Sequence, residues 1–400
     1  MKYQKGRDKI MKKFKKLFAI VSVLLTFSLI ATACGTQPDD SAKPTPTTAP
    51  KNDSAATQAP DDEVSEDPEP TETVSAEEKV PIKILYSAGL CGIPIHLAKQ
   101  LQFLEAEGLE EGIDYEYLTS STPGPEMLAT GQADVTFGLI AAMLAPLDNG
   151  LEAKTVLGVH TGCLQIIASS ESGVKTVADL KGKKIGVEKL ASSAHIVAQR
   201  ALANEGIGST ADNMEVEFIV FDKENLPIAL KNGAVDAISI GDPQATILVN
   251  EGAGISIFNS ATSELLKDEY CCSLWVRNAA IEKYPDQVAA VVRAIQKAAT
   301  WVDQNTELAA QIQLDNEWLV GDLEIDTHTI NTFKYLTSVS GVEEALTRNI
   351  LDMKELGLIR EDTDADALAK NSFFRLDGVP DSITETVEAP IDPATQIKND

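Results

Sequence analysis

The fold class of this chain can be inferred from the residues Gly233-Ala234-Val235-Asp236-Ala237-Ile238-Ser239-Ile240-Gly241 and their surroundings. Its apolar residues lie between two glycines, which predicts a short buried strand, and a helix is expected immediately before it at 226–231. The same Gly-x-x-Asp pattern occurs at Gly131-Gln132-Ala133-Asp134, again between an expected helix and an expected strand. We interpret the two copies as a duplication of one α/β unit. The alternative is the loose self-similarity that any α/β chain shows.

Strands alternate with helices on both sides of these two motifs. The first unit contains expected strands at 82–86, 115–119, 133–138 and 155–159, and the second contains strands at 184–187, 215–221 and 233–241. Such alternation predicts largely parallel sheets with both faces covered by helices. From Asp286 onward, apolar residues recur every three or four positions, which predicts amphipathic helices that cover a sheet face. The predicted fold class is therefore α/β, with two similar lobes.

The composition excludes several classes of protein. The formal net charge is −27 and the first 33 residues are basic, so the remainder is strongly acidic. An acidic surface repels a phosphate backbone, which argues against nucleic-acid binding. Five cysteines in 400 residues are too few for a disulfide-stapled scaffold, and none lies in a C-x-x-C pair. No Gly-rich phosphate loop, Ser-x-Gly elbow or zinc-helix motif appears, and we expect no cofactor.

The N-terminus has the order of features found in a secretory signal peptide. A cluster of lysines precedes the apolar run Leu17–Ile30, and the small residues Ala31-Thr32-Ala33 precede Cys34. The start, Met1 or Met11, stays open. Cysteine after small residues resembles a bacterial lipobox, in which the thiol receives a diacylglyceryl group, although Ala31 stands where Leu is usual. Lipidation (with palmitate-type chains) would hold the protein at the outer face of the cell membrane, and free secretion after ordinary cleavage is the alternative.

A polar segment separates this N-terminus from the globular body. Residues 35–79 contain no aromatic residue, and Val64 and Val74 are their only bulky aliphatics. Such a segment buries too little apolar surface to offset its ordering entropy, so we expect a disordered, extended tether.

One segment resembles the start of the second lobe in the extracytoplasmic solute-binding proteins of ABC transporters. It reads Val177-Ala178-Asp179-Leu180-Lys181-Gly182-Lys183-Lys184-Ile185-Gly186-Val187. Gly241-Asp242-Pro243, Tyr284-Pro285-Asp286, and Trp301 with Asn305 are similar to the branch that binds nitrate, sulfonates, taurine and thiamine precursors. The resemblance covers about residues 82–359. It implies a periplasmic-binding-protein type II-like fold whose two-strand hinge is expected at 163–169 and 273–277.

The resemblance and the composition together divide the chain into six parts. We expect a signal peptide (1–33), a lipidated Cys34 with a disordered linker (34–79), the first part of lobe 1 (80–169), lobe 2 (170–270), the helical second part of lobe 1 (271–378) and a loosely held polar tail (379–400).

The resemblance implies a binding function without catalysis. The protein would capture a small solute, anionic or pyrimidine-like, and deliver it as a monomer to a permease and ATPase complex. Two lobes on a paired-strand hinge close over a ligand, and loops at strand carboxyl ends and helix N-termini face such a cleft. The candidate ligand-binding residues lie in these loops: Ser87, Cys91, Gly92, Thr122, Gly138, Leu139, His160, Thr161, Lys189, Ser192, Ser193, His195, Asp222, Asp242 and Pro243.

Each candidate has an expected role and a structural alternative. Helix N-termini suit carboxylate, sulfonate or nitrate, and no Arg lies in these loops to supply a bidentate contact. Hydroxyls such as Ser192 would donate hydrogen bonds, Lys189 and His195 would add positive charge, and Asp242 would accept. The alternatives are a plain helix cap for Ser192, a solvated surface position for Lys189 and a turn at Asp242-Pro243.

Other chemistries remain open at this point. Cys91-x4-His96 and His160-x2-Cys163 lie near expected strand ends, where a Cys2His2 metal site is conceivable, but the spacing is unspecific and we expect no metal. Cys163 is equally suited to the core, or to pairing with Cys271 or Cys272. The rival functions are an enzyme that resembles thiamine-pyrimidine-precursor synthase, whose cysteine-rich motif this chain lacks, and a solute sensor without transport.

Overall fold

The computed structural model describes residues 80–87, 89–120 and 122–398. All of them belong to one structural unit. The predicted signal peptide, the lipidated Cys34 and the linker lie outside the described residues. Within the described part of the chain, no helix combines the length and the apolar character that a bilayer crossing needs.

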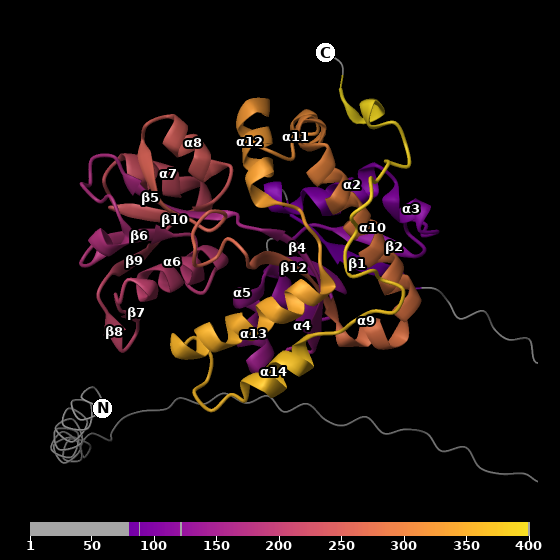
Figure 1. The fold of residues 1–400 in the computed structure, drawn as a ribbon, viewed down its shortest axis with the longest axis horizontal. Helices are drawn as coiled ribbons and strands as arrows, with labels where there is room; N and C mark the ends of the chain where they lie inside the picture. Colours follow the sequence, from indigo (N-terminus) through magenta and orange to yellow (C-terminus); the bar gives the residue numbers. More distant parts are fainter. Residues whose placement is uncertain (1–79, 88, 121, 399–400) are drawn as a thin grey trace, which may run out of the picture. The chain divides into compact units, whose positions relative to one another are not determined.

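Lobe 1 is built on a five-stranded sheet with the order β2-β1-β3-β12-β4 (Figure 1). Its strands are β1 (Ile82–Leu85), β2 (Tyr115–Leu118), β3 (Val135–Leu139), β4 (Ala153–Thr161) and β12 (Tyr270–Arg277). β1 is parallel to β2 and β3, whereas β12 is antiparallel to β3 and β4. Four strands therefore run one way and β12 runs against them.

Lobe 2 repeats this plan with the order β11-β5-β10-β6-β9. Its strands are β5 (Leu164–Ser169), β6 (Lys184–Val187), β9 (Glu217–Val220), β10 (Ala237–Gly241) and β11 (Gly254–Asn259). β5 is antiparallel to β10 and β11, and β10, β6 and β9 are parallel. A separate ribbon pairs β7 (Ser209–Thr210) with β8 (Asn213–Met214). The predicted α/β class with two mostly parallel sheets is confirmed.

The helices cover these sheets. Lobe 1 carries the short helix η1 (Leu90–Gly92), α2 (Ile93–Gln100), α3 (Phe103–Ala106), α4 (Gly124–Ala129), α5 (Ile140–Asp148), α9 (Asn278–Lys283), α10 (Pro285–Gln304), α11 (Thr306–Asp315), α12 (Leu323–Phe333), α13 (Val339–Glu355) and α14 (Ala365–Ser372). Lobe 2 carries α6 (Ser193–Asn204), α7 (Leu226–Lys231) and α8 (Gln244–Asn250). One apolar cluster packs α6 against the lobe 2 sheet, and a second packs α7 and α8 there.

The repeated Gly-x-x-Asp motif has the same structure in both lobes. Gly131 and Gly233 both adopt a left-handed φ, +69° and +66°, directly after a short helix. Asp134 then accepts a hydrogen bond from the amide of Lys83 at 3.1 Å, and Asp236 accepts one from the amide of Lys184 at 2.9 Å. The motif therefore fastens the turn after a helix to β1 in lobe 1 and to the equivalent strand β6 in lobe 2, which supports duplication of one unit.

The hinge differs from the prediction in its position. β5 pairs only within the lobe 2 sheet and β12 only within the lobe 1 sheet, so neither strand crosses between the lobes. The chain crosses instead at Gly162–Cys163 and within 260–269, and lobe 2 begins before the expected residue 170. Gly162 makes the bend because its φ is +55°, and a Cβ there would lie 2.3 Å from the Cα of Ala261 in the other crossing segment. The strands predicted as the hinge, β5 and β12, lie next to the crossing segments and do not form them.

The C-terminal segment is bound to lobe 1 and is not the loosely held tail that its polarity predicted. It extends along α10 (Figure 1), where Gln296 Nε2 donates to the carbonyl of Pro380 at 3.0 Å. The amide of Val387 donates to Gln304 Oε1 at 3.0 Å, and Asp381 accepts from the amide of Ser340 at 2.8 Å. Its sparse apolar residues pack against the core of lobe 1: Val379, Val387, Ala389, Ile391 and Ile397.

Candidate functional site

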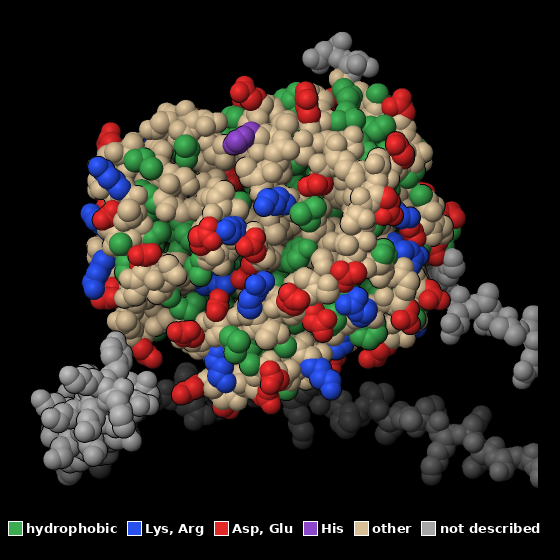
Figure 2. Space-filling model, in the orientation of Figure 1, with side chains coloured by type: hydrophobic (Ala, Val, Ile, Leu, Met, Phe, Trp, Pro, Cys, Tyr) green, Lys and Arg blue, Asp and Glu red, His purple; other side chains and the backbone are tan. Residues whose placement is uncertain are grey.

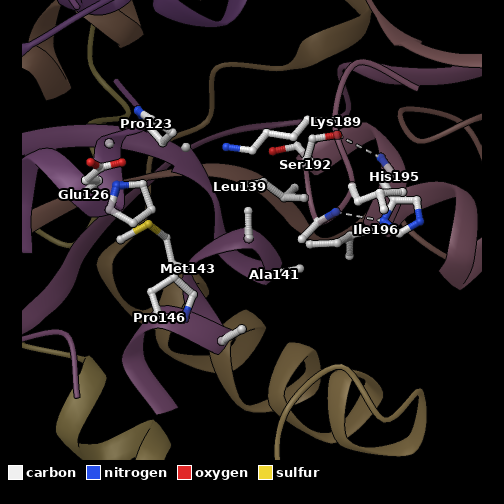
Figure 3. A pocket seen from close by; sticks show the side chains of 18 of the residues that line it. Pro123, Glu126, Leu139, Ala141, Met143, Pro146, Lys189, Ser192, His195 and Ile196 are labelled. Carbon is white, nitrogen blue, oxygen red and sulfur yellow. Dashed lines mark hydrogen bonds between the residues drawn. The ribbon is translucent and has the colours of Figure 1, made fainter. Parts of the chain in front are cut away.

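A cavity of about 1130 Å³ lies between the lobes (Figure 3). Its lobe 1 wall is formed by the start of α4, the end of β3 and the length of α5, with residues at the end of α13. Its lobe 2 wall is formed by the loop after β6, the first turn of α6 and residues 222–225. The loops that carry seven of the predicted site residues therefore contribute to one cavity.

The first turn of α6 presents backbone donors to this cavity. Ser192 is the N-cap, and its Oγ accepts from the amide of His195 at 3.3 Å. The amides of Ser193 and Ala194 have no hydrogen-bond partner among the described residues. Unpaired amides and the positive end of the helix dipole make this turn suitable for a negatively charged group. Ser192 is thus a helix cap and a cavity residue at once.

His195 is a neutral side chain. Its ring lies edge-on to Phe218 at 4.4 Å between centroids, and its Nδ1 accepts from the amide of Ala191 at 3.0 Å. Burial lowers the pKa of His195 to about 4. The expectation that His195 adds positive charge is therefore wrong.

Lys189 supplies a positive charge at the cavity. It is exposed and extends from lobe 2 across the cavity towards Pro123 and Glu126 of lobe 1 (Figure 3). Within the part of the chain that the structure describes, no acidic side chain pairs with it. A cation without an internal partner is available to a ligand.

The opposite wall is apolar, and none of the predicted site residues lies on the helix that forms most of it. Helix α5 supplies most of this wall: Ala141, Ala142, Met143, Ala145 and Pro146. The sequence does contain a sign of this apolar wall. Helix α5 carries apolar residues on all its faces, so it can contact apolar groups on two sides. One face of α5 packs into the core and the other lines the cavity.

Acidic groups outnumber basic groups around the cavity. Its lining includes four carboxylates and two ammonium groups: Glu126, Glu188, Asp222, Glu224, Lys189 and Lys223. Over the face drawn in Figure 2, acidic and basic side chains are likewise interspersed, with no basic field. Any recognition of an anion therefore depends on local contacts and not on long-range attraction.

The predicted site residues separate into two groups. Those that line the cavity are Gly138, Leu139, Lys189, Ser192, Ser193, His195 and Asp222. Those that do not line it are Ser87, Cys91, Gly92, Thr122, His160, Thr161, Asp242 and Pro243. Thr122 directly precedes the lining residue Pro123.

Two residues of the second group, His160 and Thr161, are covered by a segment far away in the sequence. His160 is fully buried and stacks on Phe333 at 5.4 Å, with Tyr335 at 5.3 Å. Thr161 Oγ1 donates to the carbonyl of Phe333 at 3.0 Å. The connection between α12 and α13 thus covers the end of β4. No local pattern in the sequence predicts this contact.

Asp242 is engaged internally and is not a free acceptor. Its two oxygens accept from Gln165 Nε2 at 3.0 and 2.9 Å. The amide and hydroxyl of Thr246 donate to it at 3.0 and 2.8 Å. Burial raises the pKa of Asp242, and these donors oppose that effect.

Cysteines and one histidine gather at the hinge, but His96 is not among them. The donor atoms of Cys91, His160 and Cys272 lie within 4.8 Å of one another, as do those of Cys163, Cys271 and Cys272. His96 instead pairs with Gln313 across 3.1 Å, and burial lowers its pKa to about 4. The Cys2His2 combination that includes His96 is therefore wrong.

Comparison with known proteins points to binding proteins. The chain is 26% identical over 227 residues to a Bacillus subtilis protein named "Putative aliphatic sulfonates-binding protein". That alignment covers 56% of this chain and 66% of the relative, just under two thirds of its length. An Escherichia coli protein of the same name is 29% identical over 186 residues, which cover 45% of this chain and 55% of that protein.

Solved structures share the fold. The alkanesulfonate-binding protein SsuA from Xanthomonas axonopodis pv. citri, bound to MOPS, superposes with a TM-score of 0.61 at 21% identity, covering 75% of this chain and all of that one. The periplasmic nitrate-binding protein NrtA from Synechocystis PCC 6803 superposes with a TM-score of 0.60 at 16% identity, covering 74% and 86%. The predicted two-lobed periplasmic-binding-protein fold is confirmed.

A family assignment follows from the sequence itself. The model of the NMT1-like family matches residues 75–314, which is more than half of the chain and includes both sheets. This protein belongs to the NMT1-like family.

Proposed function

We propose that this protein is the solute-binding component of an ABC import system. It captures a small molecule between its lobes and releases it, unchanged, to a permease and its ATPase. The cavity at the junction of two similar lobes supports this proposal, as do relatives that are named as binding proteins for sulfonates. The N-terminal signal and Cys34 would anchor it as a monomer outside the cell membrane, where an importer takes up its solute.

One observation supports the proposed chemical class of the ligand. The unpaired first-turn amides of α6 and the ammonium group of Lys189 lie on one wall, and the apolar residues of α5 form the other. A ligand that satisfies both walls has one compact anionic group and an apolar body, as in an alkanesulfonate. The surrounding carboxylates disfavour ligands with several negative charges.

The size of the cavity agrees with lobes that close on their ligand. Its volume of about 1130 Å³ exceeds the roughly 300–1,000 Å³ of small-molecule pockets. Rotation about the two crossing segments would bring α6 toward α5 and exclude water from the ligand. Bound solute should therefore compact the molecule.

A thermal-shift series tests the proposed ligand class. Alkanesulfonates of increasing chain length should raise the midpoint progressively, because each buried CH2 contributes about 0.8 kcal/mol. Sulfate and nitrate serve as matched ligands without an apolar body. An equal effect of sulfate and a long alkanesulfonate would contradict the role of the α5 wall.

Two lysine variants test the role of the α6 wall. Lys189→Met should weaken sulfonate binding about tenfold, because a charge-assisted contact contributes about 1.5 kcal/mol. Lys223→Met removes the other cavity lysine, which lies outside the α6 turn, and should change the affinity less than twofold. Isothermal titration calorimetry measures the sulfonate affinity of both variants. Equal losses of affinity would show that Lys189 does not contact the ligand.

A further inference from the structure

Four thiols and one imidazole meet where the chain crosses between the lobes. They come from four separate places: Cys91 in η1 after β1, His160 at the end of β4, Cys163 in the first crossing, and Cys271 with Cys272 at the start of β12. All except Cys91 are buried, and Cys91 is half-buried. No member of this thiol–imidazole cluster lines the solute cavity.

The backbone is distorted so that two neighbouring cysteines can join the cluster. Successive side chains of a regular strand point to opposite faces, so Cys271 and Cys272 would ordinarily diverge. The pairing of β12 with β4 shifts register on both sides of Cys272, and Cys271 has no partner in it. These irregularities place both sulfurs within 4.8 Å of each other and of Cys163 Sγ.

His160 is oriented as a ligand would be. Its Nδ1 lies 3.2 Å from the carbonyl oxygen of Thr161 and donates to it, which leaves the lone pair on Nε2. Nε2 is buried and has no hydrogen-bond partner among the described residues. A backbone carbonyl that fixes one ring nitrogen is the usual outer contact of a metal-binding histidine.

The spacing of the donors suits one tetrahedral cation. Zinc–sulfur bonds of about 2.3 Å at tetrahedral angles separate two ligand sulfurs by roughly 3.8 Å. Cys91, His160 and Cys272 form a triad whose donor atoms lie within 4.8 Å. Cys163 Sγ and Cys271 Sγ are 2.7 Å apart, which is too close for both to ligate one ion. Both sulfurs lie within 4.8 Å of Cys272 Sγ, so they border the triad without belonging to it.

We propose that Cys91, His160 and Cys272 bind a thiophilic d10 cation such as Zn²⁺. Two thiolates and one imidazole match the Cys2His set of zinc sites that keep a fourth position open. The site is separate from the solute cavity and is independent of the proposed transport function.

Cobalt(II) is the probe for the wild-type site. The full chain is reduced, freed of metal with a chelator and titrated with Co²⁺ under exclusion of oxygen. The expected result is a sulfur-to-cobalt charge-transfer band with strong visible bands of tetrahedral cobalt, saturating at one ion per chain and lost on addition of Zn²⁺. Weak octahedral absorption would overturn the proposal.

A pair of variants assigns the ligands. Cys272→Ser removes the sulfur shared by both donor groups and should abolish the tetrahedral spectrum. His96→Gln replaces a buried histidine of lobe 1 outside the cluster and should leave the spectrum unchanged. Equal spectra in both variants would contradict the assignment.

Alkylation of the wild type keeps the test decisive should Cys272→Ser fail to fold. Zn²⁺ should slow iodoacetamide labelling of Cys91 and Cys272, located by peptide mass spectrometry, at least tenfold under native conditions. Labelling that is unchanged by Zn²⁺ would refute the site independently of any variant.

Discussion

Asp326 is a buried carboxyl group in the first turn of α12, and neither of its oxygens has a hydrogen-bond partner among the described residues. Burial raises its pKa to about 7, and the charge of Asp322 contributes. In the unfolded chain an aspartate has a pKa of about 3.9, so the folded protein binds the extra proton between these values. Stability contributed by this proton is therefore lost as the pH rises from about 4 to 7.

Replacement of Asp326 by asparagine should remove that loss. Asp326→Asn should unfold at a higher urea concentration than the wild type at about pH 8, and the difference should shrink below about pH 5. Glu324→Gln, at an exposed position in the same turn of the helix, is the control and should show no such pH-dependent gain. A constant difference across the pH range would show that Asp326 is ionised in the folded state.

His195 shows what the sequence could and could not predict at a single residue. Its place in the cavity followed from its position in the first turn of a helix after a strand. Its charge did not, because the neutral form is favoured by burial against Phe218, which lies in another strand. The prediction that His160 and Asp242 line the cavity was wrong for the same reason. Phe333 covers His160 and Gln165 donates to Asp242, and both partners come from distant segments of the sequence.

The charge of His195 has a measurable consequence. With a pKa of about 4, the imidazole is neutral above about pH 6, and its protonation becomes significant only as the pH falls toward 4. Affinity for a fully ionised sulfonate should therefore be constant between about pH 6 and 8. Titrations over this range check the expectation, and tighter binding at the acidic end would indicate an imidazolium in the site.

At the scale of elements, α6 of lobe 2 is joined to α13 of lobe 1 through Arg200. The guanidinium forms two hydrogen bonds to Glu269, at 2.8 and 2.9 Å, and one to Asp352 at 2.6 Å. The side chains of Arg200 and Glu269 are 4% and 10% exposed. Asn349 completes the group, because its Nδ2 donates to Glu269 Oε1 at 2.6 Å. This ion pair holds the second crossing segment between two helices.

Loss of the arginine should leave Glu269 as a buried, unpaired charge. Arg200→Met is therefore expected to lower the free energy of unfolding by about 3–5 kcal/mol in urea titrations. Lys267→Met is the matched control, because its ion pair with Glu264 is exposed (35% and 88%) and should contribute less than about 1 kcal/mol. Similar losses in the two variants would mean that burial does not set the strength of the Arg200 pair.

Helices and strands were predicted well where the spacing of apolar residues within one segment defines them. They were predicted poorly where strand pairing between distant segments defines them. The helix at Pro285–Gln304 and the strand after Gly233 follow from apolar spacing within one segment. The direction of β5 and β12 depends on partners in other parts of the chain, so the hinge was placed beside its true position. The sheets themselves were predictable because alternating strands and helices have few alternative arrangements.

At the scale of the whole molecule, the C-terminal segment stabilises lobe 1 from outside. It covers α10 and contacts the start of α13 through Asp381, whose carboxylate accepts from Ser338 and Ser340. Removal of residues 379–400 would expose the apolar surface beneath Val379, Val387 and Ile391. We expect this deletion to lower the thermal midpoint by several degrees, because a loss of about 1 kcal/mol shifts a protein of this size by roughly 2 °C.

The deletion also distinguishes a stabilising role of the C-terminal segment from a role in ligand binding. Because the segment contacts lobe 1 away from the cavity lining, sulfonate affinity measured below the new midpoint should be unchanged. An unchanged midpoint would show that the segment adds no stability, and a lost affinity would show that it acts on the cavity.

The position of β12 in the middle of the lobe 1 sheet has a consequence for biosynthesis. All five strands of lobe 2 come from one continuous stretch, Leu164–Asn259, so that lobe can complete its sheet as soon as this stretch is available. Lobe 1 cannot, because β4 has no neighbour in its sheet until β12 arrives between it and β3. When the chain emerges N-terminus first, lobe 2 should therefore fold first, and the earlier strands of lobe 1 should complete their sheet only after β12 has emerged.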